Sequence, residues 1–149
     1  MDFQMANSAD AELILKLYEL RRETVLRQAR HWVMFEFNPA NKDEFVAVRQ
    51  AFGTENNAWL RQVISYWEMA ASFILREAMN GDMFLDTTFE GLFIYAKLHR
   101  VTEEFRDSMG QAFMPQTAAL IEKSSAARHI FQSFINNFQQ LKAAKTTNS

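Results

Sequence analysis

Amphipathic runs separated by single turn residues make up most of this chain. Within each run the apolar residues recur three or four positions apart, the spacing of one face of an α-helix. Only six residues of the chain are Gly or Pro, and they interrupt the runs: Gly53, Gly81, Gly91, Gly110, Pro39 and Pro115. The pattern predicts an all-α fold, a single-domain bundle of about five helices over residues 1–149. Residues 1–8 and 143–149 are expected to be frayed at the two ends.

The first run predicts a helix of about thirty residues. It is expected to begin near Asn7–Asp10, where side-chain acceptors cap free backbone N–H groups, and to end before Asn38 and Pro39. One broad face is apolar and carries Leu13, Ile14, Leu17, Tyr18, Thr24, Val25, Trp32 and Phe35. Arg21 projects into this apolar sector, so we expect it to extend toward solvent or to pair with a structural partner.

Two further helices are predicted in the middle of the chain. Asn41–Glu44 has the spacing of a capping box and opens a short helix that Gly53 closes. The next helix begins after a second cap at Thr54–Asn57 and continues to Met79. Asn80–Gly81 then forms a stop signal, because both residue types tolerate a positive φ angle.

The helix predicted up to Met79 carries apolar side chains around most of its circumference. Its main stripe consists of Leu60, Val63, Ile64, Trp67, Ala71, Ile74, Leu75 and Ala78. A second flank adds Trp59, Tyr66, Met69 and Phe73. A helix of this kind is buried on two sides. Either it is the central helix of the bundle, or its second flank meets another chain.

The second half of the chain predicts one more helix and a final helical region. Thr87–Glu90 has capping-box spacing and opens a helix toward Met109–Gly110. Pro115 suits the first turn of the last region. In that region apolar residues repeat at helical spacing: Ala127, Ile130, Phe131, Phe134, Phe138 and Leu141. Ser124–Ser125 is a weak point, where the region either continues or breaks in two.

The composition is that of a soluble protein with a large aromatic content. The chain holds 14 Phe, 3 Trp, 3 Tyr and 8 Met, more apolar surface than one small core needs. Its formal charge of -2 supplies no positive field for a phosphate backbone, so we expect no nucleic-acid partner. The sequence has no signal-peptide pattern and no apolar run of about 18 residues. We therefore expect no membrane span and a cytoplasmic location.

Motifs for catalysis or metal binding are missing from the sequence. The chain has no Cys, which excludes disulfides, thiolate nucleophiles and Cys-ligated metals. His31, His99 and His129 lie on different predicted helices, and none has the preceding Glu of a carboxylate-bridged di-metal bundle. No Gly-rich phosphate loop, G-x-S-x-G or H-E-x-x-H motif occurs. We therefore expect no metal, no cofactor, no catalytic residue and no enzymatic activity; whether the three histidines converge is left open.

The stretch from residue 64 to residue 123 has a pattern of aromatic and turn residues. It comprises Tyr66-Trp67-Glu68, Asn80-Gly81-Asp82, Leu85-Asp86, Phe89, Phe105-Arg106 and Gly110. With these residues the chain resembles an uncharacterised family of small all-helical bacterial proteins, classed as a domain of unknown function. The resemblance implies an all-helical fold and no site residues. Members of this family often carry a membrane-spanning segment ahead of the domain, and no such apolar run occurs here.

Two classes of function fit these features. The first is a non-enzymatic interaction or structural module that forms a homo-oligomer or binds a protein partner. Aromatic residues and Met are enriched in interface cores, and the expected interface consists of Trp59, Tyr66, Met69 and Phe73. The alternative is a helical bundle that binds a small apolar ligand or a metal ion between its helices. Its polar candidates are His31, His99, Glu68 and Glu103, with Trp67 and Phe93 as walls.

Overall fold

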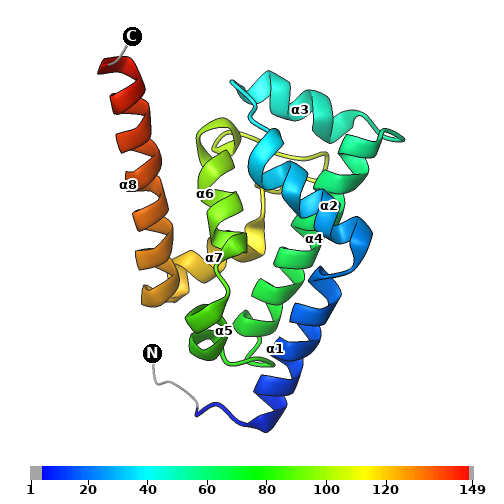
Figure 1. Cartoon of the computed structure of the whole chain (residues 1–149), viewed down its shortest axis with the longest axis vertical. Helices are drawn as coiled ribbons and strands as arrows, with labels where there is room; N and C mark the ends of the chain where they lie inside the picture. The colour runs from blue at the N-terminus through cyan, green and yellow to red at the C-terminus, as the bar shows by residue number, and fades with distance from the viewer. Residues whose placement is uncertain (1–4, 148–149) are drawn as a thin grey trace.

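The fold consists of helices joined by loops and turns. The computed structural model describes residues 5–147 and contains, within that range, eight α-helices, one π-helical turn and no strand (Figure 1). In chain order they are α1 (Ser8–Arg21), α2 (Thr24–His31), the π-turn η1 (Trp32–Glu36), α3 (Lys42–Gln50), α4 (Glu55–Leu75), α5 (Gly81–Thr87), α6 (Glu90–Thr102), α7 (Pro115–Lys123) and α8 (Ser125–Thr147). The predicted all-α fold is confirmed, whereas the predicted number of about five helices is wrong. The first predicted helix and the last helical region are each divided, and α5 is an additional short helix after the predicted stop signal at Asn80–Gly81.

The hydrophobic core is built around α4. This helix contacts α2, α3, α6 and α7, and it buries Leu60, Val63, Tyr66, Trp67, Ala70 and Ala71. Gly91 lets α6 cross closely, because a Cβ at that position would lie 3.1 Å from the Cβ of Trp67. α4 therefore occupies the centre of the bundle, one of the two positions that its sequence allows.

The single helix predicted before Pro39 is divided into α1, α2 and η1. Glu23 causes the first division, because its carboxylate accepts hydrogen bonds from the N–H groups of Val25 (3.1 Å) and Leu26 (2.9 Å). These backbone bonds also lower the pKa of Glu23. The sequence pattern did not indicate this cap, since Glu in a periodic run is an ordinary helix former.

The second division is the π-turn η1. This turn is wider than an α-helical turn, because the N–H of Phe37 donates to the carbonyl of Trp32, five residues earlier (2.8 Å). The half-buried ammonium of Lys97, on α6, donates to the carbonyls of Val33 (2.7 Å) and Met34 (2.9 Å). Burial lowers the pKa of Lys97 to about 8. Lys97 thereby supplies donors to carbonyl groups of the widened turn.

α4 ends at Leu75, earlier than the predicted Met79. Glu77 adopts a left-handed conformation with φ of 61°. The N–H groups of the two residues after it both donate to the carbonyl of Phe73, at 2.9 and 3.2 Å, and close the turn. Asn80 then caps the next helix by accepting the N–H of its third residue (2.9 Å). The predicted stop signal therefore also opens the short helix α5.

α6 ends at Thr102, well before the predicted Met109. Phe89 precedes its first residue without a side-chain capping bond, so the capping box predicted at Thr87–Glu90 does not form. Buried residues lie on both sides of α6: Leu92, Ile94, Ala96, Leu98 and Val101. After Thr102 the chain leaves the helix in a loop of residues 103–114, which lies beside α4 and carries part of the site described below.

The last helical region breaks at Ser124, the weak point predicted from the sequence. Ser124 has an extended backbone, and its Oγ accepts the N–H of Ala127 (3.1 Å), which caps α8. The fraying expected at both chain ends stays a prediction, and part of it falls on residues 1–4 and 148–149, which lie outside the described range.

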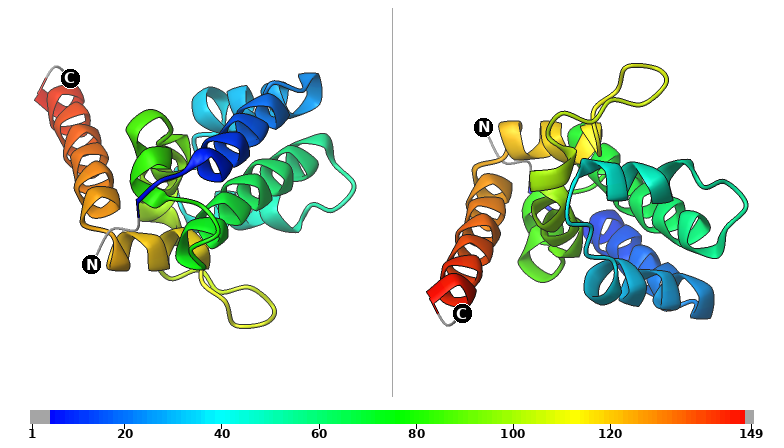
Figure 2. Two further views of the ribbon diagram at one scale, coloured as in Figure 1. Left: turned by 90° about the horizontal axis from the view of Figure 1, so that it is seen from below. Right: turned by 90° about the horizontal axis from the view of Figure 1, so that it is seen from above.

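The helices form a bundle with one outlying member. The N–H of Asn80 donates to the Asp10 carboxylate (2.8 Å) and so ties α1 to the turn after α4, while α8 contacts α5, α6 and α7 on the far side (Figures 1 and 2). The loop between α6 and α7 extends away from the helices (Figure 2). Within residues 5–147 every helix is too short or too polar to cross a lipid bilayer.

Candidate ligand-binding groove

The predicted interface residues lie on the side of α4 that faces α1 and α2. Tyr66 is 7% exposed, and its hydroxyl donates to the carbonyl of Leu17 on α1. Trp59 and Phe73 are half-buried against the core, whereas Met69 is 37% exposed. Self-association through these four side chains stays a prediction, and it would require α1 to leave Tyr66 accessible.

The candidates named for a ligand pocket have structural partners instead. The Glu68 carboxylate accepts the N–H groups of Gln116 (2.9 Å) and Thr117 (2.8 Å) and the Thr117 hydroxyl (2.8 Å). The indole N–H of Trp67 donates to Glu90 (3.1 Å). Phe93 packs against aromatic rings of α8. Trp67 and Phe93 therefore hold helices together, and Glu68 caps α7.

The three histidines lie on three different helices, α2, α6 and α8. His31 lies 3.7 Å from Glu36, and His99 lies 3.3 Å from Glu103, one turn along its own helix. His129 is exposed on α8. Across residues 5–147, the His, Asp and Glu side chains form no group of three that could hold a metal ion. The absence of a metal stays a prediction for solution measurement.

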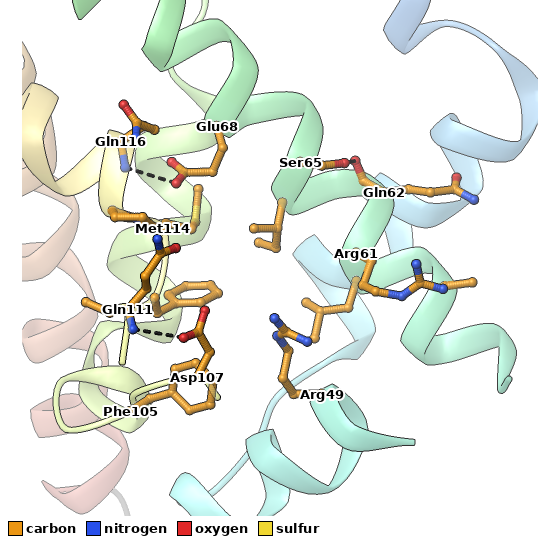
Figure 3. A pocket seen from close by; sticks show the side chains of 16 residues that line it. Arg49, Arg61, Gln62, Ser65, Glu68, Phe105, Asp107, Gln111, Met114 and Gln116 are labelled. Carbon is orange, nitrogen blue, oxygen red and sulfur yellow. Dashed lines mark hydrogen bonds between the residues drawn. The ribbon is translucent and has the colours of Figure 1, made fainter. Parts of the chain in front are cut away.

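A groove of about 590 Å³ opens between α4 and the loop after α6 (Figure 3). One wall comes from α4 and the end of α3, and the other comes from residues 105–116. Its floor is apolar and consists of Leu60, Ile64, Phe105, Phe113 and Met114. The volume lies within the range of small-molecule sites in proteins, roughly 300–1,000 Å³. An apolar floor with polar groups around it is the usual composition of such sites.

The loop wall is fixed by its own hydrogen bonds. The Oδ1 atom of Asp107 accepts the N–H groups of Met109 and Gln111, both at 2.8 Å. Gly110, with φ of 78°, supplies the left-handed residue of this turn. Met114 is also left-handed (φ 48°) and leads directly into α7. These contacts hold Asp107 at the edge of the groove, with its second oxygen free of any hydrogen bond within the described chain.

The opposite wall carries positive charge. Arg49, at the end of α3, points into the open space between the walls (Figure 3). Its guanidinium has no hydrogen-bond or ion-pair partner among residues 5–147. Arg61 turns along α4, where its Nε donates to Asn57 (2.9 Å). Arg49 and Asp107 thus face the same cavity with opposite charges and do not form an ion pair.

The sequence interpretation did not identify this groove. Of the residues that line the groove, it named only Glu68 as a polar candidate for a ligand pocket, and it placed Asp107 inside a longer helix. The one local signal was Asp107 followed by Gly110, a spacing typical of a turn. Arg49 had no sequence signal, because its meeting with the loop depends on the packing of α3 against α4 and α6.

The fold and the groove define an all-helical domain with an open, charged groove beside its central helix. The chain belongs to the family described as Domain of unknown function (DUF4760), which matches residues 6–124. The resemblance seen over residues 64–123 is thereby confirmed, and the match ends at the junction of α7 and α8. No curated protein matches the chain. No solved structure matches it either.

Proposed function

We propose that this protein is a non-enzymatic binding module whose ligand occupies the groove between α4 and residues 103–116. The observation that carries the proposal is Arg49, a cation that enters the groove without a protein partner. A charged group in such a position contributes strongly to the free energy of ligand binding, because charge-assisted hydrogen bonds are stronger than neutral ones. The groove also combines this charge with an apolar floor.

The two walls indicate the chemistry of the ligand. Arg49 favours a carboxylate, since its guanidinium can donate two parallel hydrogen bonds to the two oxygens. The free oxygen of Asp107 favours an amine or amide N–H on the other side. The floor accommodates an apolar side chain. A short peptide or an amino acid with an apolar side chain carries all three features, so we propose this class as the ligand.

Titration of the ¹⁵N-labelled protein with the dipeptide leucyl-phenylalanine tests this function. We expect amide shifts confined to the residues around Arg49 and to residues 58–68 and 105–116. Arg49→Gln is expected to weaken binding about tenfold or more, since hydrogen bonds to charged groups contribute about 1.5–3 kcal/mol. The dipeptide with an amidated C-terminus is expected to bind the native protein more weakly than the free dipeptide does. The Arg49→Gln variant is expected to bind the amidated and the free dipeptide with equal affinity.

Arg76→Gln is the matched control, because Arg76 is an exposed arginine that does not line the groove. It removes the same charge and is expected to leave binding unchanged. Equal affinity of native protein and Arg49→Gln, or shifts located away from the groove, would show that the proposed site is wrong.

A further inference from the structure

The last two helices share one continuous heptad pattern, although the chain bends between them. Apolar or small side chains repeat at alternating steps of three and four residues, and we call this row the seam: Thr117, Leu120, Ser124, Ala127, Phe131, Phe134, Phe138 and Leu141. A seam of this spacing is typical of a single long helix that packs along one side. The sequence from Pro115 to Thr147 is therefore compatible with one unbroken helix as well as with α7 and α8.

The bend itself interrupts few hydrogen bonds. The N–H of Ser124 donates to the carbonyl of Leu120 (2.9 Å), and the carbonyl of Ser124 accepts the N–H of Arg128 (2.9 Å). Both are four-residue bonds of an α-helix. The bend leaves only the N–H groups of residues 125–127 without helical bonds, and the Ser124 Oγ takes the last of them. Straightening would exchange this cap for backbone bonds.

α8 is held to the body of the protein by aromatic contacts. Ring centroids lie 5.3 Å apart for Phe93 and Phe134, 5.6 Å for Phe93 and Phe138, and 5.5 Å for Tyr95 and Phe131. No hydrogen bond or ion pair joins residues 125–145 to helices α1–α6. α8 also lies beyond the part of the chain that matches the family. Helices α1–α7 can therefore bind an α8 from the same chain or from a second copy.

We propose that the protein forms a dimer in which two copies exchange α8. Ser124 becomes helical, α7 and α8 merge into one helix, and each α8 packs on the α6 of the second copy. The same ring contacts form between chains as within one chain, and the exchange is reciprocal, so the assembly closes with two-fold symmetry. A one-residue hinge favours this outcome, because short connections invite exchange of an element. The proposal is independent of the groove, which α8 does not line.

The hinge variant Ser124→Ala tests the proposal. It removes the cap of the bent form and places a good helix former in the seam. Loss of a cap is expected to favour the straight form about fivefold per hinge, and so the dimer roughly twenty-five-fold for two hinges. Size-exclusion chromatography with light scattering, after refolding over a range of concentrations, measures the dimer fraction against the 17.4 kDa monomer.

Two substitutions are matched controls. Ser133→Ala removes a serine of α8 whose hydroxyl bonds to a carbonyl in its own helix, so it is expected to leave the dimer fraction unchanged. Ser124→Thr keeps the capping oxygen and is expected to behave as the native protein. A Ser124→Ala variant that is folded and remains monomeric at every concentration would overturn the proposal.

Cross-linking identifies the exchanged helix directly. Because the chain has no native Cys, Phe89→Cys and Phe134→Cys place single thiols at two rings whose centroids lie 6.1 Å apart. The two single variants are refolded together, with the native hinge and with Ser124→Ala, and treated with a short bis-maleimide. We expect a cross-link between the two variants to form in the mixture and in neither variant alone. A dimer that gives no such cross-link would show that its interface lies elsewhere.

Discussion

At the scale of single residues, the Tyr66 hydroxyl is a polar contact inside an apolar interface. It donates to the Leu17 carbonyl, and burial raises the pKa of Tyr66 to about 12. We expect Tyr66→Phe to lower the free energy of unfolding by about 1 kcal/mol at neutral pH, the usual contribution of one hydrogen bond. Urea denaturation of both proteins measures the difference.

The pH dependence of this contribution has a definite sign. The pKa of Tyr66 is higher in the folded protein than the ordinary value of 10.0, so the folded state holds the proton more tightly. The stabilisation is therefore complete below pH 10.0 and is lost as the pH rises toward about 12. Tyr66→Phe is expected to lose less stability over this interval. Parallel alkaline curves for the two proteins would contradict the assignment.

At the scale of helices, α7 shows how one element caps another. Its first residue is preceded by Met114, which offers no side-chain cap, and the missing acceptor is Glu68 of α4. We expect Glu68→Ala to lower the free energy of unfolding by about 1–2 kcal/mol, as loss of an N-cap does. Glu122→Ala, which removes an exposed carboxylate from α7 itself, is the control. Equal stability of the two variants in urea would show that Glu68 does not cap α7.

At the scale of the whole molecule, one ion pair connects three helices. Arg30 of α2 donates to both carboxylate oxygens of Glu90 on α6, at 2.8 and 2.6 Å, and Trp67 of α4 donates to the same group. The side chains of Arg30 and Glu90 are 19% and 11% exposed. The hydrogen bonds to Glu90 raise the pKa of Arg30. This pair therefore fixes how α2 and α6 lie on α4.

We expect Glu90→Gln to lower the free energy of unfolding by about 3 kcal/mol, because it leaves the Arg30 charge without its counter-ion. Arg30→Met combined with Glu90→Met is expected to recover part of that loss, since an apolar pair carries no charge to desolvate, although the indole N–H of Trp67 loses its acceptor. Chemical denaturation of the single and double variants measures both effects. A double variant less stable than Glu90→Gln would contradict this account, and Glu104→Gln, at an exposed position, is the control.

Most helix starts could be predicted because they depend on neighbouring residues. Asn41 accepts the N–H of Glu44 (2.9 Å), and Thr54 accepts the N–H of Asn57 (3.3 Å), as the capping patterns indicated. The site could not be predicted in this way. Arg49 and Asp107 lie on separate segments, and only the packing of those segments around α4 places them on one groove.

The sequence by itself determined the helical class and the apolar faces, because periodicity and capping act over a few residues. It also determined that α4 is apolar around most of its circumference. Only the structure showed that the first predicted helix breaks at Glu23, that the last region bends at its weak point Ser124 and does not continue straight, and that α6 ends at Thr102. Local signals allow both a bend and a straight helix at Ser124. The structure is bent there because folding back buries the aromatic face of α8 against α6. The free energy of this burial depends on residues that are distant in the sequence.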